Sequence, residues 1–263
     1  MGRFFNRVEV YSLYFFEYLR FGEFRSLRDA FVYMLSGQSN AKADVVKSGM
    51  GTFETRAGSL DFQYVNYAYE LHLKRFIEKE QFDTFLDIGA CLGEYSVWLG
   101  KKGKRCIAFE PVSHSYKMIQ RNIRLNGVEN NVTACNYGLG SKHSTEYFEL
   151  NTVNPGANKR VDGPGSNTER FEINALDSKL GELNLKPSDK ILIKIDVEGM
   201  ELEMINGARN FLTTYDNIVL IIEEKFSGES NIRNGLSQIA KFEFGKIDEH
   251  NIYARKVKPA ANS

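Results

Sequence analysis

One segment constrains this chain more than any other: residues 85–96, FLDIGACLGEYS, in which an apolar run ends in an acid and enters a turn bracketed by glycines. A second apolar run, residues 106–109, ends at Glu110. Neighbouring parallel strands have this pattern when the first offers a glycine turn to a nucleoside ligand and the second a carboxylate to its ribose. The two runs therefore predict a nucleotide-like cofactor.

The composition of the turn narrows the choice of cofactor. A dinucleotide-binding turn has three glycines, whereas here Gly89 and Gly93 enclose Ala90 and Cys91, which disfavours a pyrophosphate and with it an NAD-dependent oxidoreductase. Asp87, just before the turn, suits an ammonium or sulfonium charge, and S-adenosyl-L-methionine carries both. An α/β turn that needs glycine only for close helix packing is the structural alternative.

Four ordered blocks of the sequence resemble the FkbM-type S-adenosylmethionine-dependent methyltransferases, and the last is the most family-specific. They are Leu86 to Ser96, AFEP at 108–111, NIRLNG at 122–127 and KIDVEGME at 194–201. The resemblance covers about residues 58 to 225 and includes the block Ala175-Leu176-Asp177. Cys91 and Met200 stand where the family often has Asn and Ala, and neither change removes a charged group.

The resemblance implies a class I methyltransferase that acts on oxygen, with a sugar hydroxyl of a glycan, glycolipid or lipid-linked precursor as acceptor. The family also methylates macrolide-like and other secondary-metabolite hydroxyls, and nothing in the residues separates these acceptors. A catalytically inactive adenosyl-binding scaffold is a further alternative.

Charge and cysteine content bear on partners and compartment. Lys plus Arg and Asp plus Glu number 34 each, so net charge provides no attraction to nucleic acid, and we expect no nucleic-acid partner. The three cysteines form no C-x-x-C pair, which predicts a reducing, cytoplasmic environment. We expect neither a membrane span nor an export signal, because no long apolar run or cleavage pattern is visible.

Apolar runs alternate with helical stretches from residue 65 onward. This predicts an α/β, Rossmann-like, doubly wound and mostly parallel seven-stranded sheet with a terminal antiparallel hairpin at 241–255. The expected strands are 84–88, 105–110, 131–137, 190–196 and 217–223, and the expected helices are 94–101, 114–126, 199–212 and 229–241.

Residues 138–189 interrupt this alternation with an insertion that shows no clean helix–strand repeat. Ser144 to Leu150 and Glu169 to Ile173 alternate like two strands. The intervening residues, 151–167, are rich in Gly, Pro and Asn, and we expect either a lid over the cofactor or an exposed excursion.

We expect three parts in the chain: an aromatic-rich extension over 1–57, the methyltransferase domain over 58–257 and a tail over 258–263. Residues 1–35 interleave aromatic residues with arginines and suggest two short helices. These aromatics either cover the core or a subunit contact, or form a peripheral membrane contact. Residues 36–57 are expected to be a linker or an irregular lead-in.

Candidate catalytic residues must lie at the carboxyl ends of the strands. Asp196 ends one strand and is the first choice to position or deprotonate the acceptor, with Lys194 on the same strand face and Glu198 in the following turn. Lys194 could instead form a structural ion pair, and Glu198 a helix cap. At most one of Glu223 and Glu224 should face the site, while His72 and His250 lack an acid partner in the sequence.

No metal ion is expected, because the acidic residues lack diagnostic spacing. The residues expected to bind the amino-acid part of the cofactor are Asp87, Gly89, Ala90, Gly93, Tyr95 and Ser96. Those expected at the ribose are Glu110 and Pro111, and those expected at the adenine are Val112, Asn136 and Tyr137. Tyr137 could equally be an ordinary core residue.

Overall fold

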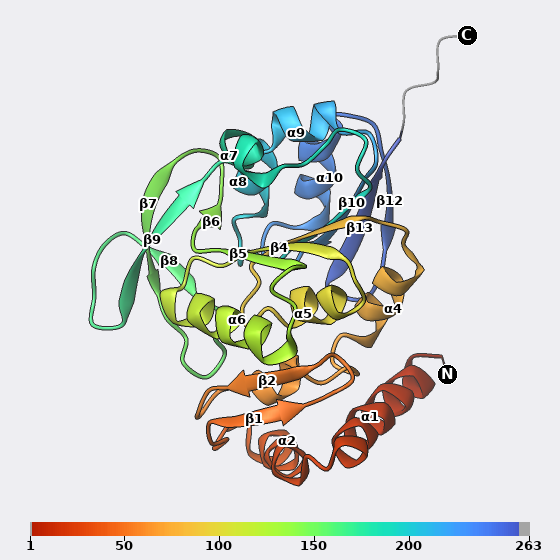
Figure 1. Cartoon of the computed structure of the whole chain (residues 1–263), viewed down its shortest axis with the longest axis vertical. Helices are drawn as coiled ribbons and strands as arrows, with labels where there is room; N and C mark the ends of the chain where they lie inside the picture. The colour runs from red at the N-terminus through yellow and green to blue at the C-terminus, as the bar shows by residue number, and fades with distance from the viewer. Residues whose placement is uncertain (1, 258–263) are drawn as a thin grey trace.

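A seven-stranded sheet forms the centre of the molecule. The computed structural model describes residues 2–257, with side chains from Glu9 onward, so the expected tail at 258–263 lies outside the described residues. The strands of the sheet are β3 (Thr84–Ile88), β4 (Arg105–Phe109), β5 (Val132–Cys135), β10 (Ile191–Ile195), β11 (Ile218–Glu223), β12 (Phe242–Lys246) and β13 (Asn251–Lys256). Their order is β12-β13-β11-β10-β3-β4-β5, and Figure 1 shows the sheet at the centre of the molecule.

The sheet has the predicted mixed topology. Strands β5, β4, β3, β10 and β11 run parallel to one another, whereas β13 is antiparallel to both β11 and β12. Each parallel neighbour requires a crossover connection, while the last two strands are joined by a tight turn. The predicted class I methyltransferase fold is therefore confirmed, including its terminal antiparallel hairpin.

Helices cover both faces of the sheet because alternate strand residues point to opposite sides. Leu86 and Ile88 belong to one buried cluster and Phe85 to the other. The Phe85 side is covered by α4 (Leu71–Lys79), α5 (Glu94–Lys101) and α6 (Ser113–Asn126). The opposite side is covered by α7 (Leu176–Leu183), α8 (Glu201–Asn206), α9 (Arg209–Thr214) and α10 (Glu229–Ser237) (Figure 1).

Two helical expectations need correction. The single helix expected at 199–212 is broken into α8 and α9 at Gly207, where an added Cβ would lie 1.9 Å from the carbonyl oxygen of Gly140. The crossing backbone of residue 140 therefore requires glycine at this position. The stretch 138–189, in which no clear helix was expected, contains α7, whose Leu176 and Leu183 are buried on the sheet.

The insertion forms a second sheet beside the first. Its strands are β6 (Gly138–Leu139), β7 (Ser144–Glu149), β8 (Lys159–Val161) and β9 (Thr168–Asn174), in the order β6-β9-β7-β8. The antiparallel pair β7 and β9 confirms the two predicted strands. The connecting segment is more regular than expected, because β8 lies within it and pairs with β7.

The N-terminal region precedes this domain. Helices α1 (Gly2–Phe21) and α2 (Phe24–Ser36) confirm the two expected helices, although α1 is long, and α3 (Asp61–Tyr64) follows later. The irregular lead-in expected at 36–57 is wrong, because β1 (Asp44–Lys47) and β2 (Thr52–Thr55) form a hairpin. Its Val46 and Phe53 are buried in the same cluster as residues of α6, and this burial stabilises the hairpin. Each strand is too short for its alternation of apolar and polar residues to be recognised in the sequence. Within residues 2–257, no helix combines the length and apolar character needed to cross a bilayer.

Candidate active site

The glycine turn after β3 lies directly against the end of β10. Gly89 has a φ of +86°, and an added Cβ would lie 1.9 Å from the carbonyl oxygen of Asp196. The Asp196 amide donates to the oxygen of Ile88 (3.0 Å), and the amides of Gly89 and Ala90 both donate to the oxygen of Phe109 (3.1 Å each). The missing side chain of Gly89 thus lets the ends of three adjacent strands meet.

Glu110 ties the ends of two strands to the same turn. Its carboxylate accepts hydrogen bonds from the amides of Cys91 and Val112, both at 2.9 Å. Burial raises the pKa of Glu110 to about 7, although these two hydrogen bonds and the charge of Arg56 oppose the rise. Each carboxylate oxygen can accept a second hydrogen bond, so Glu110 keeps capacity for ligand hydroxyls.

Several expected cofactor residues lie beneath the turn. Asp87 is buried and accepts a hydrogen bond from the Ser96 hydroxyl at 2.7 Å, and burial raises the pKa of Asp87. Tyr95 is also buried, and its hydroxyl donates to Glu70. These side chains support the turn from below, and sequence reasoning did not distinguish such support from direct ligand contact.

Glu94, which no sequence pattern singles out, has an unusual environment. Among the side chains that the structure describes, its Oε2 is the one buried polar atom without a hydrogen-bond partner. Burial raises the pKa of Glu94 to about 8, and the neighbouring charge of Asp87 adds to the rise. A buried carboxylate oxygen without a donor is costly, and a cationic ligand group beside the turn would satisfy it.

A cluster of charged side chains lies where β10 and β11 end. Lys194 Nζ is 2.9 Å from Asp196 Oδ2, and the lysine side chain is 7% exposed. Burial alone would lower the pKa of Lys194, but the charges of Asp196, Glu70 and Asp87 raise it above its ordinary value. Carboxylate oxygens of Asp196, Glu198 and Glu223 lie within 4.8 Å of one another. The structure therefore joins the expected catalytic residues with Glu223 in one group.

Two of these carboxyl groups have pKa values raised to the neutral range or above. Burial and the charge of Asp196 raise the pKa of Glu198 to about 7. Burial, the charges of Asp196 and Glu198, and a hydrogen bond with Asp196 raise the pKa of Glu223 to about 8. Glu224 points elsewhere, since it pairs with Lys246 at 3.1 Å. As expected, one of the two consecutive glutamates faces the site.

A cleft that is open to solvent runs from the glycine turn and Glu110 to Asp196 and Glu198. One wall is apolar, because the inner face of the insertion sheet packs Phe148, Phe171 and Ile173 against Val112 and Met200. The rings of Phe148 and Phe171 stack with centroids 4.9 Å apart. The alternation of residues 144–150 and 169–173 was the sequence signal for this wall.

The lining of the cleft separates the expected residues into two groups. Those that line it are Gly89, Glu110, Pro111, Val112, Asp196 and Glu198. Asn136 instead donates from its amide to the oxygens of Glu110 and Pro111, and Tyr137 packs on Phe109. The next two residues, Gly138 and Leu139, line the cleft in their place. His250 is exposed and bonds through its backbone to Asp248, and His72 lies on α4.

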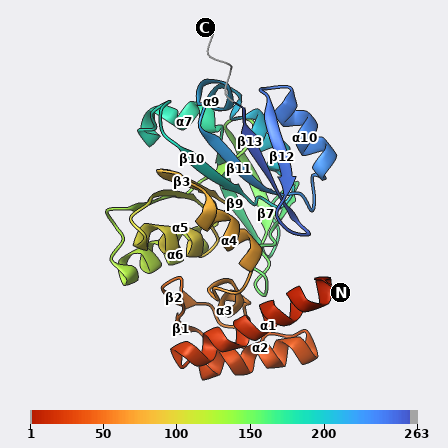
Figure 2. The same cartoon turned by 90° about the vertical axis from the view of Figure 1, so that its right-hand side faces the viewer.

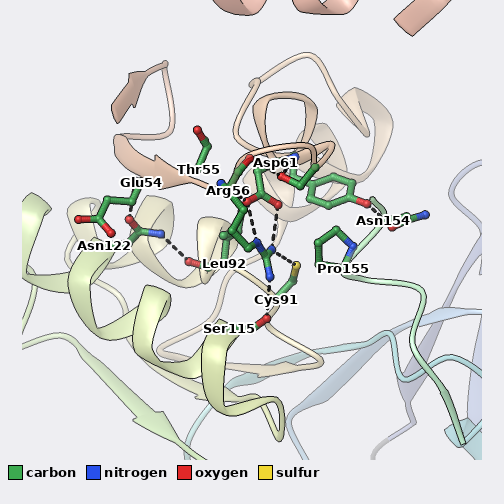
Figure 3. Close-up of polar contacts among 12 residues, drawn as sticks. Glu54, Thr55, Arg56, Asp61, Cys91, Leu92, Ser115, Asn122, Asn154 and Pro155 are labelled. Atoms are coloured by element: carbon green, nitrogen blue, oxygen red, sulfur yellow. Dashed lines mark hydrogen bonds and ion pairs between the residues drawn. The ribbon is translucent and has the colours of Figure 1, made fainter. Parts of the chain in front are cut away.

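Arg56 connects the N-terminal region to the turn (Figure 3). Its guanidinium forms two hydrogen bonds of 2.8 Å with buried Asp61, donates to the Ser115 hydroxyl at 2.9 Å and reaches the Cys91 sulfur at 3.6 Å. Nearby, the Asn122 amide donates to the Leu92 oxygen at 3.0 Å. Residues before the expected domain boundary at 57/58 therefore support the glycine turn. No sequence pattern predicts this long-range contact.

The connecting segment of the insertion crosses the mouth of the cleft. Pro155, Gly156 and Asn158 line the cleft beside Asp196. The segment is attached from the other side, because the Tyr64 hydroxyl donates to Asn154 and the Leu60 amide donates to the Val153 oxygen at 2.9 Å. This placement favours a lid over an exposed excursion.

Loosening this attachment should impair substrate binding. Tyr64→Phe removes the hydroxyl that bonds to Asn154 and should raise the KM for the acceptor about two- to tenfold, the equivalent of one hydrogen bond, with a smaller effect on kcat. Tyr67→Phe is the matched control, because its hydroxyl bonds to Glu78 on the exposed surface. Equal KM values for both variants and the wild type would show that the attachment does not control access.

Several known proteins are similar to this chain in sequence. The sequence profile described as the methyltransferase FkbM domain matches residues 87–250. The hexuronic acid methyltransferase AglP of Haloferax volcanii is 27% identical, over 55% of this chain and 58% of its own length. The methyltransferase sdnD of Sordaria araneosa is 31% identical, over 46% of this chain and 59% of its own length. The chain thus spans less than two thirds of either relative.

The crystal structure of methyltransferase FkbM from Methylobacillus flagellatus KT aligns with a TM-score of 0.49 and 18% identity, over 73% of this chain and 53% of that chain.

Proposed function

Since the chain belongs to the methyltransferase FkbM domain family, we propose that it transfers the methyl group of S-adenosylmethionine to a hydroxyl oxygen of a sugar. S-adenosylmethionine, the methyl donor of this family, supplies an electrophilic methyl group on a sulfonium centre. The observation that carries the proposal is the shared cleft, in which the glycine turn and Glu110 lie beside the Lys194–Asp196 pair.

The residues around the cleft fit the three parts of the donor. Glu110 has free acceptor capacity for both ribose hydroxyls. Val112, Phe148, Phe171 and Met200 offer an apolar wall suited to adenine. The unpartnered oxygen of Glu94, beside the turn, suits the ammonium group.

Asp196 is the residue that would receive the acceptor hydroxyl. In methyl transfer to a neutral hydroxyl, the new C–O bond forms as the S–CH3 bond breaks and the donor leaves as neutral S-adenosylhomocysteine, while a positioned carboxylate can accept the proton that the hydroxyl releases. Lys194 fixes one carboxylate oxygen of Asp196 at 2.9 Å, and Asp196 lines the cleft, so a ligand hydroxyl would compete with Glu223 for the other oxygen of Asp196. The insertion segment lies over this position, where it would exclude water and align the two reactants.

The acceptor class rests on similarity rather than on a residue. The relative from Haloferax volcanii is named as a hexuronic acid methyltransferase, which supports a sugar acceptor. The relative from Sordaria araneosa is named only as a methyltransferase, and a secondary-metabolite hydroxyl remains the alternative. We further propose a reducing, cytoplasmic location, since Cys91, Cys106 and Cys135 are all free thiols.

A transfer assay with methyl-labelled donor tests this function. Neutral oligosaccharides, uronic-acid oligosaccharides and macrolide alcohols would be offered in parallel. We expect the label in a sugar as an alkali-stable ether, with turnover unchanged by a chelator. Label released by mild alkali would show methylation of a carboxylate instead, and absence of transfer to every sugar would contradict the proposed acceptor class.

Glu110 provides a test of cofactor placement that does not need the acceptor. Glu110→Gln should weaken binding of S-adenosylhomocysteine about tenfold or more, because the ribose loses a charged hydrogen-bond acceptor. The exposed Glu129→Gln on the loop after α6 is the control. Calorimetry that gives equal affinities for both variants, with normal melting, would contradict this placement.

The affinity for S-adenosylhomocysteine, measured by the same calorimetric titration, should depend on pH. Because the pKa of Glu110 is raised to about 7, the free protein holds a proton there at lower pH, and binding to the ionised carboxylate must release it. The contribution of Glu110 to wild-type affinity should therefore rise with pH until about one unit above this pKa and then level off. Glu110→Gln should remove this contribution, whereas a rise centred near the pKa of Glu94, about 8, should persist.

A further inference from the structure

The N-terminal helices expose a surface that the proposed reaction does not use. In α2, Phe24, Arg28, Phe31 and Leu35 recur at i, i+4, i+7 and i+11, so they share one helix face. We call these four residues the outer stripe. Phe24 and Leu35 are 67% and 83% exposed, and the side chain of Arg28 is 63% exposed.

The helices lie at the end of the molecule remote from the central sheet, side by side (Figure 2). Part of their aromatic content is internal, because Tyr18 is buried with Phe62 of α3 and packs against Tyr14. Phe16 and Leu19 of α1 remain more than half exposed. The expectation that these aromatics cover a core therefore accounts for only some of them.

The acidic residues of the helices are engaged with the rest of the protein. Glu9 pairs with Arg75 of α4 at 2.7 Å, and Glu17 and Glu23 accept the amides of Gly49 and Lys47 in the β1–β2 hairpin. Asp29 is 9% exposed and pairs with Arg28. The acids that interrupt the basic and aromatic pattern in the sequence are thus withdrawn from the outer stripe.

The arginines remain accessible. Arg20 is exposed and lies over the Phe21 ring, and Arg25 is 77% exposed although it pairs with Asp44 at 3.0 Å. Such exposed ion pairs are weak, so lipid phosphates can replace the carboxylate partners. On the outer stripe itself, Arg28 adds an exposed guanidinium group to the apolar side chains.

We propose that the outer stripe docks on an anionic lipid bilayer, with Phe24, Phe31 and Leu35 in the headgroup region and Arg28 on lipid phosphates, assisted by the exposed Arg20 and Arg25 of the same two helices. Charge favours a bilayer over a second copy of the chain. A twofold interface would bring the Arg28 residues of both copies onto the same face, and no acid of α1 or α2 among the described side chains lies free there to receive them. A bilayer supplies the negative charge.

Vesicle flotation of the full chain tests the proposal without donor or acceptor, so its result is independent of the proposed reaction. We expect binding to vesicles of phosphatidylcholine with phosphatidylglycerol, little binding to phosphatidylcholine alone, and loss of binding at high salt. Phe24→Ser with Leu35→Ser, and separately Arg20→Gln with Arg28→Gln, should each weaken binding on the order of tenfold or more.

The control is Arg124→Gln with Leu125→Ser on α6, which removes the same chemical types from another exposed surface, and it should bind like the wild type. Three results would overturn the proposal: no flotation of the wild-type chain, equal flotation with both lipid compositions, or equal losses in the control. Sedimentation showing a dimer that Phe24→Ser with Leu35→Ser dissociates would assign the surface to a second copy instead.

Discussion

Asp196→Asn should lower turnover about a hundredfold or more while leaving cofactor affinity nearly unchanged. The substitution preserves the shape of the side chain and removes the carboxylate that would accept the hydroxyl proton. It also removes the charge opposite Lys194, 2.9 Å away, so the fold should be checked by melting. Single-turnover kinetics with saturating donor would measure the chemical step directly.

Glu198→Gln is the informative companion variant. Its carboxyl group lies in the same cluster and has a pKa raised to about 7, a value suited to a base at neutral pH. We expect a fall of about tenfold or less, because Glu198 would act on the reaction through the charge of Asp196. If Glu198→Gln causes the hundredfold loss and Asp196→Asn does not, the proton acceptor is Glu198.

Gly89→Ala should have the second large effect, on both stability and cofactor binding. An alanine Cβ would lie 1.9 Å from the backbone oxygen of Asp196 at a φ of +86°, and neither strand end can move without breaking contacts of the sheet. We expect a loss of roughly 3 kcal/mol or more in the free energy of unfolding, and no measurable binding of S-adenosylhomocysteine where the variant folds.

Gly103→Ala is the control that distinguishes the steric contact at Gly89 from the cost of placing alanine at a positive φ. Gly103 has a φ of +78°, but no atom lies within 4 Å of an added Cβ, so only the left-handed backbone cost of about 1 kcal/mol applies. Urea unfolding and calorimetry of the two variants would show the difference. Equal stability and equal cofactor affinity in both variants would disprove the requirement for close approach at Gly89.

The central sheet could be predicted because its strands are buried on both faces and therefore form continuous apolar runs. The expected strands at 84–88, 105–110 and 190–196 differ from β3, β4 and β10 by no more than one residue at either end. The strand-end acids Glu110 and Asp196 followed from the same pattern. Sequence periodicity therefore predicts those functional side chains that a parallel sheet places together at the carboxyl ends of its strands.

The rest of the site depends on contacts between segments far apart in the chain. The apolar wall requires β7 and β9 to lie beside Val112, and Arg56 reaches Cys91 across 35 positions of sequence. The β1–β2 hairpin was missed because each strand has only four residues and is stabilised by packing on α6. No local pattern encodes such placements, and the unpartnered oxygen of Glu94 appears only after the turn is built.

A crystal structure of the protein with S-adenosylhomocysteine would test the central claim most directly. We expect the ribose hydroxyls within hydrogen-bond distance of the Glu110 carboxylate, the adenine between Val112 and Phe171, and the sulfur open toward Asp196. The claim would be contradicted if the nucleoside occupied the neighbouring groove lined by Arg56 and His114, or if its sulfur faced away from Asp196.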